Sequence, residues 1–219
     1  MRIERSEIPL SSLTLLSVRR VHGRAVLSLS SGETRVMPRA LLKERPYRGG
    51  TPFDEAVFET LLRERAYPFA LEKAVSLLAV RARTEKELRD ALHQCAYPED
   101  TIDRVMARMQ EAGYLNDADF AAHWAASRTG KGMGTRRIGM ELRRKGVSSE
   151  TIGQTLDAID EDELLEGALK TARKAAKGRD LSLPAERQKV SAALIRRGYG
   201  YDHARKALSQ LLEEQAPAD

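Results

Sequence analysis

The fold of this chain is decided by the stretch RIGMELRRKGVSSETIGQTLDAI, at Arg137–Ile159, because the sequence contains the same pattern three times. The other versions are ELRDALHQCAYPEDTIDRVMARM at Glu87–Met109 and KVSAALIRRGYGYDHARKALSQLL at Lys189–Leu212. Their starting positions lie 50 and then 52 residues apart. A helix–turn–helix pattern that recurs at nearly constant spacing predicts tandem units with a long surface, rather than one closed pocket. Such a chain is expected to bind a partner and not to be an enzyme.

The turn inside each version predicts how its first helix ends. Ile138 and Leu142 lie one helical turn apart and form part of an apolar stripe that the following helix covers. Gly146 and Gly198 follow this stripe and are expected to adopt a left-handed conformation, which has no steric cost for glycine. Ala96 occupies the same position in the first version, so that turn is expected to be strained or closed differently.

One further helix-forming segment precedes each version, so each repeat has three helices. The predicted fold is mainly α, with three tandem three-helix repeats in an elongated, curved array. The predicted boundaries are 67–115, 116–160 and a third repeat with a short tail at 161–219. The predicted helix starts are Thr84, which opens a capping box, Asn116 or Asp117, Thr135, Ser148 and Pro184.

The segment 1–66 differs from the rest and is expected to form a small domain with a β-meander and a helix. The runs LTLLSV, RAVLSLS and ETRVM are separated by the turn signals His22–Gly23 and Ser31–Gly32, which predicts three short strands. A helical turn is expected over 38–43. A helix should open at Thr51–Pro52 and run to about Arg65, and a separate helix should follow Pro68.

Composition limits the possible environments and partners. The chain has 219 residues, a net charge of +5 and a pI of about 9.4, which favours an anionic partner. The single Cys95 excludes an internal disulfide framework and fits a reducing compartment. No stretch approaches the roughly 20 apolar residues that span a bilayer, and the N-terminus has no secretory signal. The expected location is cytoplasmic, without membrane contact.

Basic residues gather in two blocks, over 131–145 and 170–197, with an acidic block over 157–166 between them. Taken together, the basic blocks are interpreted as a partner- or DNA-binding surface. The alternative for any single residue is a solvated surface charge, worth about 0–1 kcal/mol as an ion pair. The predicted surface consists of Lys131, Arg136, Arg137, Arg143, Arg144, Lys145, Arg187, Lys189, Arg196 and Arg197.

Within the first block, GKGMGTRR at Gly130–Arg137 leads a glycine-rich loop into the start of a helix. Free backbone N–H groups and the helix dipole attract anions at such a position, so a phosphate or an acidic side chain is expected at 135–137. The alternative is a flexible connection between helices. The order GxxxxGK[ST] of a Walker motif is absent.

No arrangement of residues predicts a metal site, a cofactor or a catalytic centre. The four histidines lie in different predicted elements without the spacing of metal ligands, and no nucleophile elbow, HExxH motif or catalytic carboxylate pair occurs. Trp124 is expected to pack in a core rather than to stack on a base. The four histidines are His22, His93, His123 and His203.

Four phrases of the chain resemble the RecX family, regulators of the bacterial RecA recombinase. They are ALEKAVSLLAVRARTEKEL at Ala70–Leu88, GYLNDADFAAHWAASR at Gly113–Arg128, IGMELRRKGVSSETI at Ile138–Ile152 and LIRRGYGYDHARKAL at Leu194–Leu208. The second phrase has GYLND where GYLDD is commoner, and both residues cap helices.

The resemblance implies a non-enzymatic protein that binds along the groove of the RecA–single-stranded-DNA filament, touching DNA directly or through RecA. A monomer is expected, although the sequence leaves the oligomeric state open. It also implies that the protein limits filament growth or promotes disassembly. That effect would lower ATP hydrolysis, strand exchange and coprotease activity in recombination, DNA repair and the SOS response. Two alternatives remain open: a stand-alone nucleic-acid-binding protein of helix-turn-helix type, and a helical scaffold for another protein.

Overall fold

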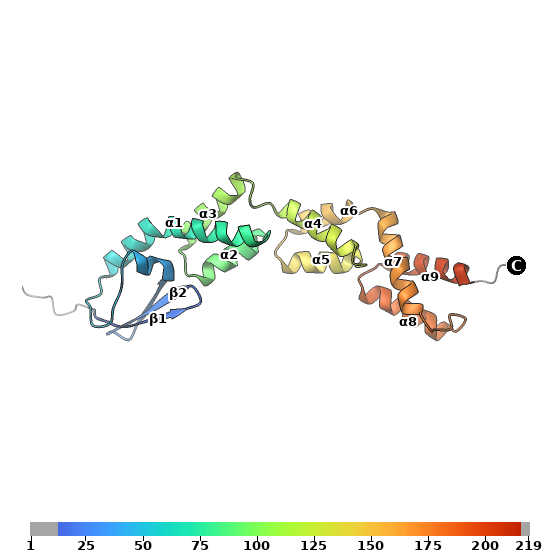
Figure 1. The fold of residues 1–219 in the computed structure, drawn as a ribbon, viewed down its shortest axis with the longest axis horizontal. Helices are drawn as coiled ribbons and strands as arrows, with labels where there is room; N and C mark the ends of the chain where they lie inside the picture. Colours follow the sequence, from blue (N-terminus) through green and yellow to red (C-terminus); the bar gives the residue numbers. More distant parts are fainter. Residues whose placement is uncertain (1–12, 216–219) are drawn as a thin grey trace, which may run out of the picture. The chain divides into compact units, whose positions relative to one another are not determined.

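The computed structural model describes residues 13–215, which form a three-stranded sheet, a short 3-10 helix and nine α-helices (Figure 1). The mainly helical fold with a small N-terminal sheet is therefore confirmed. The chain divides into two compact units, one ending at Leu115 and the other beginning at Asn116. Each unit is described by itself.

The sheet of the first unit is the predicted antiparallel meander, in the order β1-β2-β3. The β1–β2 turn has left-handed backbone angles at both central residues, with φ of 43° at His22 and 88° at Gly23. Two such residues in succession match the twist of the flanking strands and fix the register. The strands are β1 (Leu15–Val21), β2 (Arg24–Leu29) and β3 (Thr34–Pro38).

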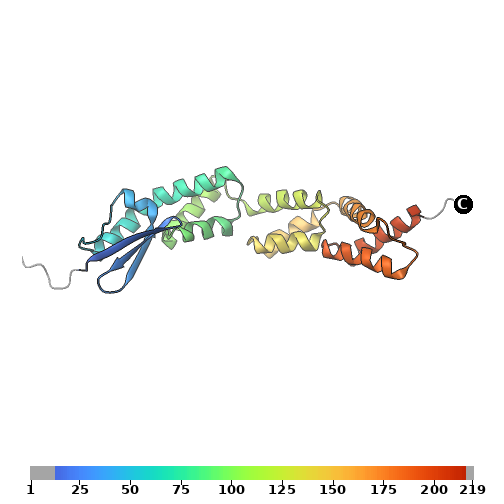
Figure 2. The ribbon, with the colours of Figure 1, turned by 60° about the horizontal axis from the view of Figure 1, so that its bottom comes forward.

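One face of this sheet packs against helices and completes the core of the first unit. Leu27 and Met37 on the sheet are fully buried in the same cluster as Leu41 and Phe58. Leu41 belongs to the 3-10 helix η1 (Arg39–Lys43), which matches the predicted helical turn. Figures 1 and 2 both show the strands beside η1 and the first helix.

The first helix, α1 (Glu55–Val80), is a single element, so the prediction of two helices broken before Pro68 was wrong. The predicted boundary between residues 66 and 67 falls inside it. A proline in a helix interior costs about 3 kcal/mol. Here Ala66, Ala70 and Ala74 are fully buried at four-residue spacing on both sides of the proline, and this packing outweighs the local cost.

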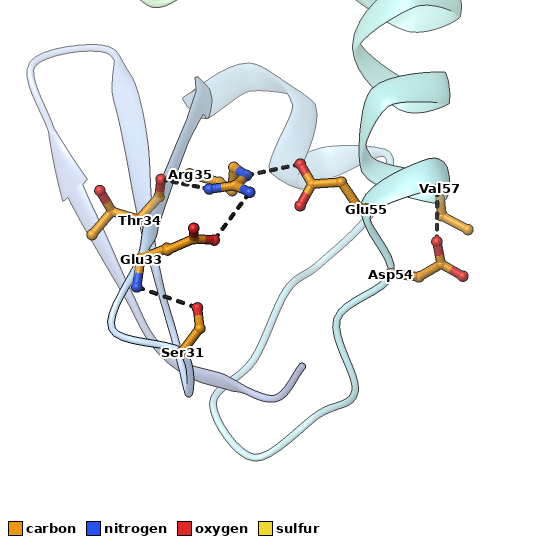
Figure 3. A network of polar contacts seen from close by, with 7 residues as sticks. All are labelled: Ser31, Glu33, Thr34, Arg35, Asp54, Glu55 and Val57. Atoms are coloured by element: carbon orange, nitrogen blue, oxygen red, sulfur yellow. Dashed lines mark hydrogen bonds and ion pairs between the residues drawn. The ribbon is translucent and has the colours of Figure 1, made fainter. Parts of the chain in front are cut away.

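The start of α1 also differs from the prediction, because Asp54 rather than Thr51 caps the helix. The Asp54 carboxylate accepts a hydrogen bond from the Val57 N–H at 3.0 Å. Arg35 on β3 ties the sheet to this helix start, with its Nε 2.7 Å from Glu55 Oε1 (Figure 3). Its Nη2 lies 3.2 Å from Glu33 Oε2.

The second half of α1 forms the first repeat with α2 (Glu85–Gln94) and α3 (Glu99–Glu111). Thr84 caps α2 as predicted, since its side chain accepts a hydrogen bond from the Glu87 N–H. The turn between α2 and α3 holds Ala96 at a φ of 61°, which is the strain expected for a side chain at a glycine position.

The second unit contains two further three-helix repeats, each with its own apolar core. The predicted caps Asn116 and Ser148 accept hydrogen bonds from backbone N–H groups at their helix starts. Gly146 and Gly198 have φ of 89° and 92°, as predicted for helix ends. The helices are α4 (Asp117–Thr129), α5 (Thr135–Arg144), α6 (Ser149–Asp157), α7 (Glu161–Ala176), α8 (Pro184–Arg196) and α9 (Tyr201–Gln215).

Candidate anion-binding site between the second and third repeats

The loop before α5 packs directly on the turn after α8. The Gly134 N–H donates a hydrogen bond to the Arg197 carbonyl at 3.0 Å, and the Arg136 N–H donates one to the Gly198 carbonyl at 3.1 Å. A Cβ atom on Gly134 would lie 2.3 Å from the Tyr199 nitrogen, a distance that no folded backbone tolerates. The two backbones can therefore meet only because glycine occupies this position.

This contact changes the interpretation of GKGMGTRR. The sequence predicts free N–H groups at the start of α5 that would hold an anion. Instead, the Gly134 and Arg136 N–H groups are used by carbonyls of the third repeat, and the Ile138 N–H bonds to the Gly134 carbonyl within its own helix start. The Arg137 N–H also bonds to the Gly134 carbonyl, so two of the three N–H groups at 135–137 have protein partners. These contacts favour the alternative of a connection between helices, and an anion at 135–137 stays a prediction. The loop joins two repeats.

Tyr199 lies beneath this joint and fixes its position. Its side chain is almost fully buried and its hydroxyl hydrogen-bonds with Thr171 of α7. Burial raises the pKa of Tyr199 above 10.0, although Thr171 opposes this effect. A Cβ on Gly167 would lie 2.8 Å from the Tyr199 hydroxyl, so a glycine on α7 leaves the space that the phenol fills.

Above the joint lies an open cavity of about 380 Å³ with a basic rim and an apolar floor. Four of its lining side chains are cations and none is a carboxylate. Within residues 13–215, Lys174, Arg196 and Arg197 form no ion pair, and Arg137 makes one contact at 3.4 Å with Glu141. The lining residues are Met133, Arg137, Thr171, Lys174, Ala175, Ala193, Arg196 and Arg197.

Glu141 orients the cations of α5 and the neighbouring helix. It accepts hydrogen bonds from Arg128 Nε at 2.7 Å and Trp124 Nε1 at 3.2 Å, as well as from Arg137. Burial disfavours its ionised form, but these hydrogen bonds outweigh burial and lower the pKa of Glu141 below 4.5. The ionised carboxylate therefore pairs with one cation on each of two helices, Arg128 of α4 and Arg137 of α5.

Trp124 packs against the core of the second repeat, as predicted, and its ring is covered by cations. The Arg128 guanidinium lies 4.0 Å from the ring centroid and the Lys145 ammonium 4.3 Å from it. Cation–π contacts of this kind are worth about 0.5–1 kcal/mol each at exposed sites. Lys145 therefore has a structural contact in addition to its charge.

The structure divides the ten predicted surface residues into groups. Arg137, Arg196 and Arg197 meet around the cavity, and Arg144 lies seven residues after Arg137, on the same side of α5. Lys131 and Arg143 are exposed. The other four make contacts within the protein. Lys145 lies over the Trp124 ring and Arg136 lies 5.4 Å from the Tyr201 ring centroid. Arg187 donates hydrogen bonds to the carbonyls of Leu181 and Ser182, and Lys189 pairs with the Glu186 carboxylate.

Lys174 is the one lining cation that the predicted set omits. It belongs to the second basic block, but α7 and α8 must pack together before Lys174 comes close to Arg196. No local signal in the sequence contains this information. Chemically, four cations above an apolar floor can bind a carboxylate or a phosphate.

The chain is similar to known proteins over most of its described length. Models of the RecX family match it three times: the first three-helix domain at residues 70–109, the second at 116–156 and the third at 161–208. A protein named Regulatory protein RecX from Mycobacteroides abscessus is 40% identical over 168 residues, which cover 67% of this chain and 73% of that protein. The protein of the same name from Bacillus velezensis is 36% identical over 143 residues, 64% of this chain and 54% of that protein.

Two solved structures share the fold. A crystal structure of RecX from Lactobacillus salivarius aligns with a TM-score of 0.64 at 20% identity, over 68% of this chain and 97% of that chain. A crystal structure of a regulatory protein RecX aligns with a TM-score of 0.61 at 20% identity, over 94% of this chain and 100% of that chain. Among residues 13–215, no helix is long and apolar enough to cross a membrane. The same residues contain no cluster of three side chains suited to a metal ion.

Proposed function

The chain belongs to the RecX family of regulatory proteins, and from this premise we propose that it binds the RecA–single-stranded-DNA filament. In this proposal it acts without catalysis of its own and lowers the activities of RecA, including ATP hydrolysis and strand exchange. The basic cavity between the second and third repeats is the contact for an anionic group of the filament, either an acidic side chain or a DNA phosphate.

The observation that supports this proposal is the convergence of unpaired cations. Almost a third of the chain is charged, and most basic side chains near the cavity have partners, such as Arg173 with Glu214 and Arg179 with Glu186. Lys174, Arg196 and Arg197 have none within residues 13–215, although carboxylates are abundant. Cations held together without counter-charge repel one another, and an incoming anion relieves that repulsion.

The same geometry argues against the stand-alone helix-turn-helix alternative. In that binding mode the second helix of each pair enters the DNA groove by its first turn. Here each of these second helices has a carboxylate in its first turn. The first turn of α3 contains Glu99 and Asp100, that of α6 contains Glu150, and that of α9 contains Asp202. Carboxylates at these positions repel phosphates, so none of the three pairs has the charge of a recognition helix.

The test is ATP hydrolysis by RecA on single-stranded DNA, with this protein titrated in below the RecA concentration. Inhibition at substoichiometric amounts, with weak binding to the same DNA without RecA, supports filament regulation. Tight, salt-sensitive binding to bare DNA without any effect on RecA would instead support the stand-alone alternative.

The cavity is tested with the double substitution Arg196→Gln and Arg197→Gln. Each cation contributes on the order of 1 kcal/mol to a hydrated contact, so filament affinity should fall about 30-fold. The matched control is Lys177→Gln with Arg205→Gln, which removes the same charge from exposed residues of the same repeat that do not line the cavity. Equal reduction in both variants would show that total charge matters and the cavity does not.

A further inference from the structure

A further concentration of positive charge lies outside the repeats, in residues 13–50, which form the N-terminal sheet, η1 and the loop that follows. Residues 13–50 contain eight lysines or arginines and two glutamates, a formal charge of +6, compared with +5 for the whole chain. The remainder of the chain is therefore nearly neutral. This segment therefore adds positive charge outside both basic blocks of the repeats, whose own charge is balanced by acidic residues elsewhere in the chain.

Both glutamates of this segment are already used. Glu33 pairs with Arg35, which also contacts Glu55 at the start of α1 (Figure 3). Glu44 pairs with Arg65 of α1. Among residues 13–215, the other seven cations of the segment form no ion pair. They are Arg19, Arg20, Arg24, Arg39, Lys43, Arg45 and Arg48.

Three of these cations line an open cavity of about 500 Å³ together with Lys73 of α1. Arg20 comes from β1, while Arg39 and Lys43 are the first and last residues of η1. No carboxylate lines the cavity. The remaining lining residues are Gly23, Ala40, Leu42, Cys95 and Tyr97.

Backbone packing fixes the wall of this cavity independently of its charges. The Arg39 N–H donates a hydrogen bond to the Gly23 carbonyl at 2.8 Å, which holds η1 against the β1–β2 turn. A Cβ on Gly23 would lie 2.8 Å from the Cys95 sulfur, so the same turn is in close contact with the end of α2. The four cations are thus held around one space by the core of the first unit.

We propose that this cavity seats a phosphate group. Phosphate presents several charged oxygens and can accept hydrogen bonds from donors on several sides, whereas a carboxylate has two oxygens and suits one arginine fork. Donors at Arg20, Arg39 and Lys43, with Lys73, surround the space from three elements and so match phosphate. The phosphate belongs either to the backbone of single-stranded nucleic acid or to a free nucleotide. The proposal concerns the first unit and does not require RecA.

Cys95 provides an internal reporter for this site. It is the only cysteine of the chain, lines the cavity and is 9% exposed. The experiment measures the rate at which a small thiol reagent labels Cys95, without RecA, in the presence of an oligothymidylate, ATP or inorganic tripolyphosphate. The quantity compared is the ratio of rates with and without ligand, because removing nearby cations also changes the reactivity of the thiol itself.

Saturating ligand should slow labelling at least about tenfold, since the bound group occupies the space through which the reagent reaches the sulfur. Arg39→Gln with Lys43→Gln should abolish this protection, and the salt dependence of oligonucleotide binding should fall by about 0.7 in log–log slope for each phosphate that the variant no longer neutralises. The control pair Arg63→Gln and Lys86→Gln removes the same charge from exposed residues outside the cavity and should leave protection unchanged.

The three ligands identify the source of the phosphate. Protection by the oligonucleotide alone assigns the site to a nucleic-acid backbone, and protection by ATP or tripolyphosphate alone assigns it to a free phosphorylated ligand. Protection by all of them supports a site that reads only the phosphate. No protection by any ligand, or protection that survives in the Arg39/Lys43 variant, overturns the proposal. Since RecA is absent, none of these results depends on filament regulation.

Discussion

Substitution of Gly134 by alanine tests the joint between the second and third repeats. Gly134 has φ of −81° and ψ of 164°, which alanine adopts without strain. The substitution therefore acts only through its new Cβ, which would lie 2.3 Å from the Tyr199 nitrogen and 2.4 Å from the Gly198 carbonyl carbon and oxygen. All three atoms are backbone, so relief requires the loop to move away from the turn.

The cost of that movement follows from the hydrogen bonds that it breaks. The joint contains the hydrogen bonds from Gly134 to Arg197 and from Arg136 to Gly198, each worth about 0.5–1.5 kcal/mol net. We expect the free energy of unfolding of the second unit to fall by about 1–3 kcal/mol. Arg137 also moves away from Arg196 and Arg197, so the affinity for an anionic partner should fall as well.

Urea unfolding followed by the fluorescence of Trp124, the only tryptophan, measures the stability change. Gly153→Ala is the matched control, because Gly153 lies inside α6 and a Cβ at this position would have no neighbouring atom within 4 Å. Alanine is the better helix former, so this control should gain up to about 1 kcal/mol. If Gly134→Ala unfolds at the wild-type urea concentration and binds its partner normally, the joint does not hold the basic cavity together.

Three further predictions concern single residues. Because the pKa of Glu141 is lowered in the folded state, this residue contributes stability above its ordinary pKa of 4.5, and that stability is lost as the pH falls through the lower folded value. An acid titration followed by Trp124 fluorescence should therefore have its midpoint below pH 4.5. A midpoint at or above pH 4.5 would contradict the Arg128 and Arg137 contacts. Ala96→Gly should be neutral or stabilise the fold by up to about 1 kcal/mol, because glycine adopts a φ of 61° without the strain that alanine has there. The control Ala79→Gly, on the exposed face of α1, should cost about 1 kcal/mol. Equal destabilisation of both variants in thermal unfolding would refute strain at Ala96. Tyr199→Phe should cost about 0.5–1.5 kcal/mol because it removes the partner of the Thr171 hydroxyl, and an unchanged urea midpoint would show that this hydrogen bond has no net value.

Local sequence signals predicted the elements whose causes are themselves local. The β1–β2 turn follows from His22–Gly23, and the starts of α2 and α4 follow from Thr84 and Asn116, because these side chains bond to N–H groups two or three residues away. The interpretation of Pro68 as a helix break failed for the opposite reason. The local cost of proline is real, but the buried alanines of α1 belong to a packing surface that only the folded unit creates.

The candidate site was predictable only in part. The repeated pattern indicated Arg137, Arg196 and Arg197, and these three do meet. The same charge pattern also selected Arg187, which instead closes the loop between α7 and α8 through two carbonyls. A charge run shows that cations are present, but the hydrogen-bond partners that decide the role of each cation come from other elements.

The two basic cavities lie near similar backbone contacts. In the first unit the glycine turn at Gly23 packs on the end of α2 near Cys95, and in the second the glycine loop at Gly134 packs on the end of α8 near Gly198. These helix ends are equivalent positions of the repeated pattern. In both places the close approach is possible because glycine has no Cβ, and a cavity lined by cations lies nearby. These backbone contacts do not depend on the charge of the lining cations, so we expect substitution of a cation in either cavity to change its charge without loss of the fold.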